Sequence, residues 1–446
     1  MTHSSTFPRI SSPPTTCPRL RIMMDTTSPT NPLIPLHTAL AHLTSSPFPP
    51  VPSPPSTSKR ASVALIIRLT PSFAHPPLTS TSPPCDLATF FSQPWTQYAV
   101  PEVLFIKRAA RKGDRWTSHI ALPGGKRDPE DADDLAAAIR ETREEVGLDV
   151  SPENEWVLQA GNLPQRLITS SWGKKALMVL CPYIFVVTGG STRVSMQPSE
   201  VASCHWVPVS GLLDGRNRTV VEEDVSARFA NQETGVKRWL ARMVVGKMVF
   251  SAVRLWPGES VKCLESPAAE AGSEGWGLWM KGLVPGRTRY EVEPPLLLWG
   301  LTLGVMADFL DLLPPHNALG LWSYPTFTPL DVRIVIWVLS WRFRQRKQKE
   351  VQEIQQNRIP AVEVGLDAIG VGDNLKEGGI HGLCTGLHAD NERMRMKSSA
   401  VSTILEGYYD IVRKGVAIAL VGRTSVLIAL AAWIYARHKQ RRTLLK

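Results

Sequence analysis

The segment at residues 122–148, LPGGKRDPEDADDLAAAIRETREEVGL, constrains the fold of this chain more than any other stretch. It joins a Gly-rich turn and an acidic loop to a segment in which apolar residues recur at helical spacing. A helix over residues 134–146 would place one stripe of side chains against a core. The members of that stripe are Leu135, Ile139, Thr142 and Val146.

The other side of this helix carries three glutamates, Glu141, Glu144 and Glu145. Glu141 and Glu145 are one turn apart, so their carboxylates project side by side, and Glu144 lies on the same flank. A charged helical face is often only solvated, but crowded carboxylates also suit Mg²⁺, which prefers oxygen ligands and binds substrate phosphates. Because the Gly-rich turn lets the backbone approach a ligand closely, the segment predicts a metal-dependent phosphoanhydride site.

The spacing of these residues resembles the Nudix box, in which Gly and Glu precede Arg-Glu, an aliphatic residue, any residue, Glu-Glu, any residue, Gly and an aliphatic residue. The matching positions are Arg140, Glu141, Glu144, Glu145, Gly147 and Leu148. The separation from Gly125 to Arg140 is one residue longer than in the general pattern. Asp131 occupies the early acidic position, and Thr142 replaces the aliphatic residue.

The longer spacing, together with PGGKRDP and AIRE, is similar to the coenzyme A diphosphatase branch of this family. The run LLLWGLT at residues 296–302 is similar to the start of the closing helix in that branch. Ser118 and His119 do not reproduce the His-x-Gly element of the branch, and we expect His119 to pack at the rim of the site. The resemblance covers residues 61–313 and implies diphosphate hydrolysis, with coenzyme A or its acyl esters as open substrates.

The resemblance also implies roles for single residues. Glu144 would bind Mg²⁺ or Mn²⁺ directly or through water, and Arg140 would orient the carboxylates or meet a phosphate oxygen. For the general base, Glu200 is our candidate because it precedes a predicted strand, and an ordinary loop glutamate is the alternative. The residues expected to act are Arg140, Glu144 and Glu200 in catalysis, Arg108, Gly124, Gly125 and Lys126 in substrate binding, and Glu141, Glu144 and Glu145 as metal ligands.

Strands surround the acidic helix on both sides in the sequence, and a further helix follows them. Apolar and β-branched runs predict the strands, and the order implies an α/β/α sandwich with a mixed sheet, as the resemblance also does. The strands are expected at residues 61–70, 102–107, 119–122, 156–160, 176–187 and 204–209, and the closing helix at residues 295–313.

Composition divides the chain into four regions. We expect a disordered Pro/Ser/Thr-rich segment at residues 1–59, because it cannot bury enough apolar surface, although an organellar transit peptide is an alternative. The Nudix domain follows at residues 60–315, with an insertion at residues 210–293 that either shapes the pocket or lies on the surface. The remaining regions are a basic and polar linker at 316–400, with an apolar helix at 331–343, and a helical membrane anchor at 401–446.

Residues 415–435, GVAIALVGRTSVLIALAAWIY, have the length and composition of a membrane-spanning helix and precede the basic run RHKQRR. Arg423 opposes insertion by roughly 2.5–3.5 kcal/mol, which the apolar residues offset. The guanidinium would snorkel or pair with an acid such as Asp410. A buried or partner-binding helix is the alternative.

The net charge and the cysteines limit which partners and which compartment we expect for this protein. The net charge of +10 is distributed along the chain, and its sharpest concentrations flank the apolar segments near the C-terminus, which favours an anionic membrane surface over nucleic acid. The six cysteines form no Cys-x-x-Cys pair, so neither a disulfide scaffold nor structural zinc is expected. We expect a reducing compartment, with mitochondrion or peroxisome open, and a homodimer is an open option.

Three functional hypotheses follow. The first is a Mg²⁺- or Mn²⁺-dependent diphosphatase that acts on a small-molecule diphosphate and is tethered to a membrane. The second is a catalytically silent module that binds a ligand or protein, and the third makes membrane shaping by the C-terminal segments the main role. The three glutamates at residues 141, 144 and 145 favour the first, because ligand binding alone does not require all of them.

Overall fold

The computed structural model describes ten stretches of the chain. These are residues 33–77, 82–111, 117–170, 175–189, 193–224, 246–263, 295–314, 316, 323–367 and 407–444. The chain divides into two compact units, Met1–Asn31 and Pro32–Lys446, and all described residues belong to the second. Within the insertion expected at residues 210–293, residues 225–245 and 264–293 lie outside the described residues.

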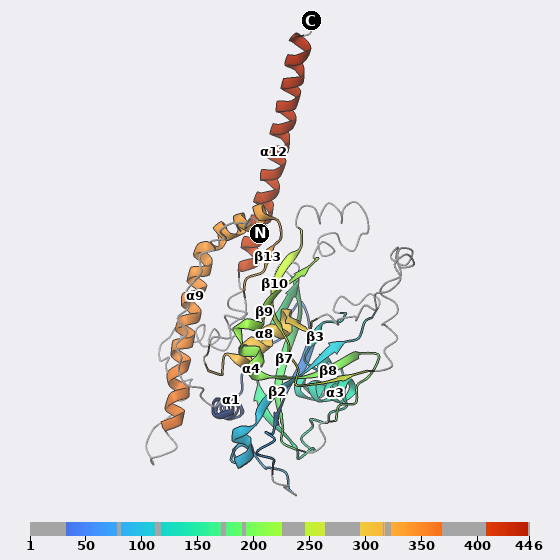
Figure 1. Cartoon of the computed structure of the whole chain (residues 1–446), viewed down its shortest axis with the longest axis vertical. Coiled ribbons are helices and arrows are strands. Elements are labelled where there is room, and N and C mark those ends of the chain that lie inside the picture. Colours follow the sequence, from blue (N-terminus) through green and yellow to red (C-terminus); the bar gives the residue numbers. More distant parts are fainter. Residues whose placement is uncertain are drawn as a thin grey trace, which may run out of the picture. The chain divides into compact units, whose positions relative to one another are not determined.

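Among the described residues, nine strands form one mixed sheet with the central order β11-β8-β2-β1-β7-β5. Figure 1 labels β8, β2 and β7 of this sheet. The short strands β3, β4 and β6 pair with β2, β1 and β7. The pair β1–β7 is parallel and the others are antiparallel, which confirms the predicted mixed sheet. The bounds are β1 Arg60–Thr70, β2 Val100–Arg108, β3 Ile120–Ala121, β4 Gly124–Lys126, β5 Val157–Asn162, β6 Arg166–Ser170, β7 Lys175–Val187, β8 Val201–Pro208 and β11 Glu259–Lys262.

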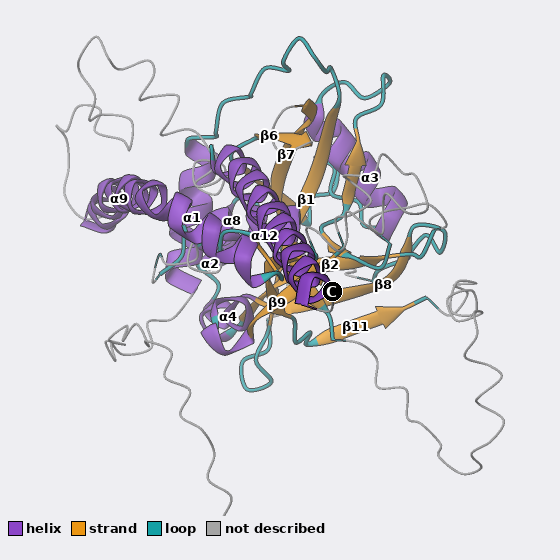
Figure 2. Ribbon diagram, turned by 90° about the horizontal axis from the view of Figure 1, so that it is seen from above, coloured by secondary structure: helices purple, strands orange, loops and turns teal. Residues whose placement is uncertain are grey.

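The main sheet has an apolar core on each face because its central strands alternate their side chains with a period of two. In β1, Leu65 and Ile67 enter one core, whereas Ala64 and Ile66 enter the other. Helix α3 (Asp134–Val146) packs on the second core, and α1 (Leu33–Ser45), α2 (Leu87–Phe91) and α8 (Gly300–Leu310) pack on the first (Figure 2). The predicted α/β/α sandwich is therefore confirmed.

The start of the described chain differs from the disordered segment expected up to residue 59. Helix α1 buries Leu36 and Leu40 completely in the first core. The Pro-rich stretch that follows is fastened by side-chain amides, since Asn162 Oδ1 accepts from Phe48 N at 3.0 Å and Gln165 Oε1 accepts from Val51 N at 2.8 Å. Composition did not predict this ordered stretch, because the side chains that accept these backbone hydrogen bonds lie more than a hundred residues further along the sequence.

The region expected as an insertion at residues 210–293 contributes strands to both sheets of the structure. β11 extends the main sheet beside β8, whereas β9 and β10 belong to a smaller antiparallel sheet of order β12-β10-β13, in which β9 pairs with β10. The predicted closing helix is preceded by a strand and starts only at Gly300, whose φ is 67°. The remaining bounds are α4 Val209–Leu213, β9 Arg218–Glu223, β10 Met248–Arg254, β12 Leu297–Trp299, β13 Thr326–Phe327, and the 3₁₀ turns Pro94–Tyr98 and Gly215–Asn217.

Two long helices follow the small sheet, α9 (Leu330–Asp367) and α12 (Tyr408–Leu444). The helix predicted at residues 331–343 is thus the beginning of a much longer one that continues through the basic run RQRKQK. Within the described part of the chain, one helical segment, Tyr408–His438, is long and apolar enough to cross a membrane, and its most apolar 18 residues have a mean hydropathy of 2.0. It contains the predicted residues 415–435.

Candidate active site

Helix α3 begins and ends where the sequence supplies caps. The side chain of Asp133 accepts a hydrogen bond from Ala136 N at 2.7 Å, which satisfies one of the free N–H groups of the first turn. Gly147 ends the helix in the left-handed region, with φ 70°. The aliphatic position taken by Thr142 is fully buried, and its hydroxyl donates to Ala138 O at 2.7 Å, so the helix itself satisfies the polar group.

Glu145 points into the protein and is only 2% exposed. Its Oε2 accepts a hydrogen bond from Gly124 N at 2.8 Å, which links α3 to the Gly-rich turn. Burial raises the pKa of the Glu145 carboxyl to about 7, against the opposing effect of the Gly124 N–H, and the neighbouring charge of Glu141 acts in the same direction as burial. A carboxylate held in this way is costly unless a cation joins it.

Glu141 lies against the backbone of Gly125. A Cβ atom on Gly125 would stand 2.4 Å from Glu141 Oε1 and from its carboxylate carbon, so only glycine allows this approach. Strand β4 holds Gly125 in place by pairing it with Ser62 of β1. Burial raises the pKa of Glu141, although Arg140 opposes this rise.

Glu141, Glu145 and Glu200 each offer a carboxylate oxygen to one cluster, in which these atoms lie within 4.8 Å of one another. The first two come from α3, and Glu200 comes from the turn before β8. Arg111 fixes Glu200 through an ion pair of 2.6 Å, and Ala109 N donates to Glu200 O at 2.7 Å. The structure therefore brings Glu200, the predicted general base, beside two of the predicted metal ligands.

Glu144, expected as a metal ligand together with Glu141 and Glu145, is not a member of this cluster. Its side chain is 52% exposed, and its Oε2 accepts from Arg140 Nη1 at 3.0 Å. The reason is helical geometry, because consecutive positions are about 100° apart around the axis, so Glu144 and Glu145 cannot point the same way. Glu200 takes the third place instead.

Arg140 braces the acidic loop against the helix. Its guanidinium donates to both carboxylate oxygens of Asp131, from Nε at 2.9 Å and from Nη2 at 3.1 Å. It also donates to Lys126 O at 3.1 Å and to Glu141 Oε1 at 3.2 Å. The hydrogen bond from Arg140 lowers the pKa of Asp131, and Asp131 raises the pKa of Arg140. Of the two roles left open for Arg140, these contacts favour orienting the carboxylates.

The remaining predicted residues surround the cluster in different ways. Arg108 stands at the end of β2, where its charge lowers the pKa of Glu145, opposing the effect of burial. Lys126 is exposed on β4. The ring of His119 packs 4.8 Å from that of Trp299, in agreement with the expected packing role. The sequence analysis did not predict a role for Arg111. Its signal in the sequence was its place in the basic run KRAARK at residues 107–112.

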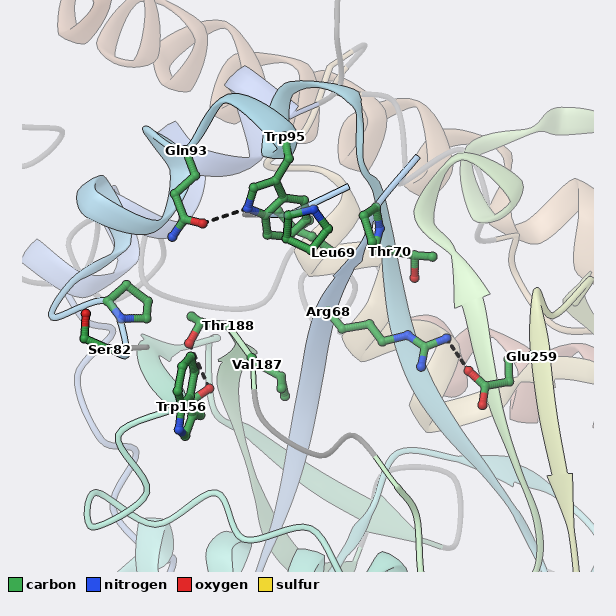
Figure 3. Close-up of a pocket in the computed structure, with 14 residues that line it drawn as sticks. Arg68, Leu69, Thr70, Ser82, Gln93, Trp95, Trp156, Val187, Thr188 and Glu259 are labelled. Atoms are coloured by element: carbon green, nitrogen blue, oxygen red, sulfur yellow. Dashed lines mark hydrogen bonds and ion pairs between the residues drawn. The ribbon is translucent and has the colours of Figure 1, made fainter. Parts of the chain in front are cut away.

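A cavity of about 460 Å³ lies elsewhere, around Arg68 and Trp156 (Figure 3). Arg68 is near the C-terminal end of β1, whereas the Gly-rich turn pairs with the N-terminal end of that strand at Val63. The guanidinium of Arg68 is already paired with Glu102 at 2.8 Å and with Glu259 at 2.6 Å. The cavity therefore belongs to the end of the sheet opposite the carboxylate cluster.

A mixed sheet between helical layers, with a capped acidic helix set against a Gly-rich turn, defines a Nudix-type domain. The NUDIX domain profile matches residues 97–228. An uncharacterised protein of Schizosaccharomyces pombe, C14C4.10c, is 31% identical over 295 residues, which are 65% of this chain and 77% of that protein. The chain belongs to the Nudix hydrolase family.

Similarity to the coenzyme A diphosphatase branch is confined to a short stretch. The mouse mitochondrial coenzyme A diphosphatase NUDT8 is 46% identical over 61 residues, and this alignment spans 14% of the chain and 29% of the mouse protein. A solved MutT/nudix family protein of Enterococcus faecalis is 19% identical, with a TM-score of 0.22, over 35% of this chain and 47% of that chain. The predicted resemblance to this branch is confirmed at the level of sequence.

Proposed function

We propose that this Nudix hydrolase is a divalent-metal-dependent diphosphatase that cleaves the phosphoanhydride of a nucleoside-diphosphate-linked small molecule. The observation that supports it best is the convergence of the Glu141, Glu145 and Glu200 carboxylate oxygens within 4.8 Å. Coenzyme A and its acyl esters are the substrates we propose first, because the mouse relative named a coenzyme A diphosphatase is 46% identical to this chain over 61 residues.

The donor set fits Mg²⁺ or Mn²⁺. All three groups are carboxylates, which hard divalent cations prefer, and the burial of Glu145 leaves a negative charge that a cation would neutralise. We assign Glu141, Glu145 and Glu200 to the ion. When bound, such an ion would neutralise charge on the diphosphate oxygens and lower the pKa of a water molecule that it binds.

The chain's own residues then have distinct tasks. The N–H of Gly124 holds the Glu145 carboxylate, and Arg140 holds Glu141, so that both acids are positioned before substrate arrives. Glu200, fixed by Arg111, is our candidate to accept the proton of the attacking water at a carboxylate oxygen. We assign Glu144 a role through water only, because its side chain is 52% exposed and lies outside the carboxylate cluster.

For substrate phosphates we propose Arg108 and Lys126 as cations and the turn of Gly124 and Gly125 as the backbone surface. A guanidinium suits the forked geometry of a phosphate, and an ammonium acts as a compact charge. Arg108 lies on the strand that pairs with β8 beside Glu200, since it stands opposite Val201 in the register. Arg108→Ala should therefore raise KM more than it lowers kcat.

The test is product formation from coenzyme A, an acyl-coenzyme A, ADP-ribose and NADH, with and without Mg²⁺ or Mn²⁺. We expect Glu145→Gln to lower kcat by at least about a hundredfold, the upper end of losses found when even a second-shell partner of a metal is removed. Glu144→Gln, one position earlier and exposed, is the matched control and should cost about tenfold or less. No turnover of any of these substrates would favour the catalytically silent module, and a rate indifferent to metal and to Glu145→Gln would contradict a metal-dependent diphosphatase.

We also propose that α12 anchors the enzyme to a membrane in a reducing compartment. Its apolar length supports the anchor, and the free thiols among the described residues, Cys85, Cys181, Cys204 and Cys263, agree with reducing conditions. The mitochondrion is the first compartment to examine, because the mouse relative is named a mitochondrial protein. Fractionation of cells that express the full chain tests both points.

A further inference from the structure

Three contacts fasten helix α3 along the paired strands β1 and β4. Asp134, Glu141 and Glu145 are separated by seven and then four positions, so their side chains share one face of the helix. Glu145 accepts a hydrogen bond from Gly124 N, and Glu141 lies against Gly125. The third contact, at Asp134 in the first turn, is an ion pair. The helix face that carries two acids of the carboxylate cluster is therefore held at its start by a third acid.

Asp134 is held by the guanidinium of Arg60, at the start of β1. Arg60 Nε donates to Asp134 Oδ1 at 2.8 Å and to Oδ2 at 2.9 Å, and Arg60 Nη2 lies 2.7 Å from Oδ2. Their side chains are only 13% and 10% exposed. A second cation, Arg127, places its Nη1 3.4 Å from Asp134 Oδ1. Asp134 is thus neutralised by the protein's own arginines, and it is not a member of the carboxylate cluster.

Arg60 also fixes the strand that carries the Gly-rich turn. Arg60 O accepts a hydrogen bond from Arg127 N at 3.0 Å, directly after the end of β4. Arg127 Nη2 in turn donates to Ala132 O at 2.8 Å, in the loop that leads into α3. One residue of β1 therefore contacts both elements that form the carboxylate site, β4 through its backbone and α3 through its side chain.

The remaining donors of Arg60 hold the N-terminal strap, which we define as residues 46–53. Nη1 donates to Val51 O at 2.9 Å and to Ser53 Oγ at 3.1 Å. Nη2 donates to Gln165 Oε1 at 2.8 Å, and the same oxygen accepts from Val51 N. Every nitrogen of the guanidinium is thus engaged, which fixes its orientation. Both Arg60 and the strap precede residue 97, where the match to the NUDIX domain profile begins.

Apolar packing alone does not set the position of α3 precisely. Leu135 and Val146 pack the helix on the second core, but apolar attraction is non-directional. A metal site needs its ligands to be held within roughly 0.5 Å of their working positions. Because a helix moves as a rigid element, a shift at Asp134 is carried about two turns along to Glu141 and about three turns along to Glu145.

We propose that Arg60 is a positioning residue of the carboxylate site, and that the N-terminal strap, by holding Arg60, is part of the active-site scaffold. The inference rests on the proposed metal site and deepens it by assigning the residue that sets α3 against the Gly-rich turn. Arg60 acts through Asp134 on the ligands Glu141 and Glu145. Lysine cannot replace it, because an ammonium lacks the planar fork of donors that reaches the helix and the strap together.

The test is titration of the full chain with Mn²⁺, followed by electron paramagnetic resonance below the unfolding temperature of every variant. Arg60→Lys keeps the charge and loses the fork, and Asp134→Ala removes the acid that the fork holds. Each should weaken Mn²⁺ binding by about tenfold, the lower end of the losses found for outer-shell partners of a metal ligand. The spectrum at saturating Mn²⁺ should also change, because the ligands have moved. Gln165→Leu removes the acceptor that Arg60 shares with the strap and should weaken Mn²⁺ binding as well.

The matched control is Asp133→Ala, one position before Asp134. Asp133 caps the first turn of α3 through Ala136 N, so its loss weakens the start of the helix and leaves the Arg60–Asp134 pair in place. This variant should bind Mn²⁺ as the wild type does, although its unfolding temperature falls. Arg60→Lys, which keeps the charge balance, carries the test if Asp134→Ala does not fold.

Wild-type Mn²⁺ affinity in Arg60→Lys or in folded Asp134→Ala would overturn the inference and leave the metal site in place. Equal losses of affinity in the Asp133 and Asp134 variants would also overturn it, because they would show a general loosening of the helix start. Wild-type affinity in Gln165→Leu would overturn the role assigned to the strap. A wild type that binds no Mn²⁺ would instead overturn the proposed metal site itself.

Discussion

At the scale of single residues, the site depends on two close contacts between a Gly-rich turn and an acidic helix. Gly124 N holds Glu145, and the absent side chain of Gly125 leaves room for Glu141. The sequence predicted both glycines as points of close backbone approach, because only glycine lacks the Cβ atom that would interfere. The sequence could not show that the group packed against Gly125 is the carboxylate of Glu141 and not a bound ligand.

Gly125→Ala should displace Glu141 from the carboxylate cluster, since the new methyl group would stand 2.4 Å from its oxygen. We expect activity to fall by about tenfold to a hundredfold, comparable with the loss of a group that orients a metal ligand. Gly211→Ala is the control, because a Cβ atom there meets nothing within 4 Å. Equal activity of the two variants would show that the contact at Gly125 does not position Glu141.

The buried Glu145 should make the metal-free protein lose stability as the pH rises. Burial raises its pKa from an ordinary value of 4.5 to about 7, so folding favours the protonated form. The contribution of Glu145 to the free energy of unfolding is fully present below about pH 4.5 and is lost as the pH rises through about 7. For this pKa shift the loss is about 3 kcal/mol. Thermal unfolding in chelator should therefore show Glu145→Gln gaining on the wild type between these pH values. A constant difference across this range would contradict the buried, unneutralised carboxylate.

At the scale of elements, local pattern predicted α3 well and long-range pairing poorly. The helix over residues 134–146 and its cap at Gly147 follow from spacing and cap chemistry within fifteen residues, and the structure agrees with both. Glu200 entered the cluster through the pairing of β8 with β2, which sets Val201 opposite Arg108. A single sequence does not encode that register in a readable form, so the sequence predicts Glu144 as a metal ligand and Glu200 as the candidate general base, and does not place Glu200 in the cluster.

The closing helix α8 is joined to β6 by a buried ion pair between Asp308 and Arg166, whose side chains are 4% and 5% exposed. Asp308→Ala would leave the guanidinium of Arg166 buried without its counter-ion, which should cost about 3–5 kcal/mol of unfolding free energy. Glu222→Ala, which breaks an exposed pair with Lys247, should cost less than about 1 kcal/mol. Denaturant unfolding compares the two, and similar costs would contradict the structural role of the buried pair.

At the scale of the whole molecule, the chain combines a Nudix domain with two long helices, of which α12 carries a long apolar segment. Composition predicted an apolar helix at the C-terminus because length and hydropathy are local properties. It did not predict that α9 continues far beyond residue 343, or that an acid at its start meets Arg423. Those features require the two helices to be packed together, which the linear sequence does not reveal.

The central claim is that three convergent glutamates hold a divalent cation. Titration of the full chain with Mn²⁺, followed by electron paramagnetic resonance or calorimetry, tests it without reference to any substrate. We expect Glu141→Gln, Glu145→Gln and Glu200→Gln each to weaken Mn²⁺ binding by about tenfold to a hundredfold, while Glu144→Gln should bind Mn²⁺ nearly as the wild type does. Unchanged binding in the Glu145 and Glu200 variants, or a loss confined to Glu144→Gln, would contradict it.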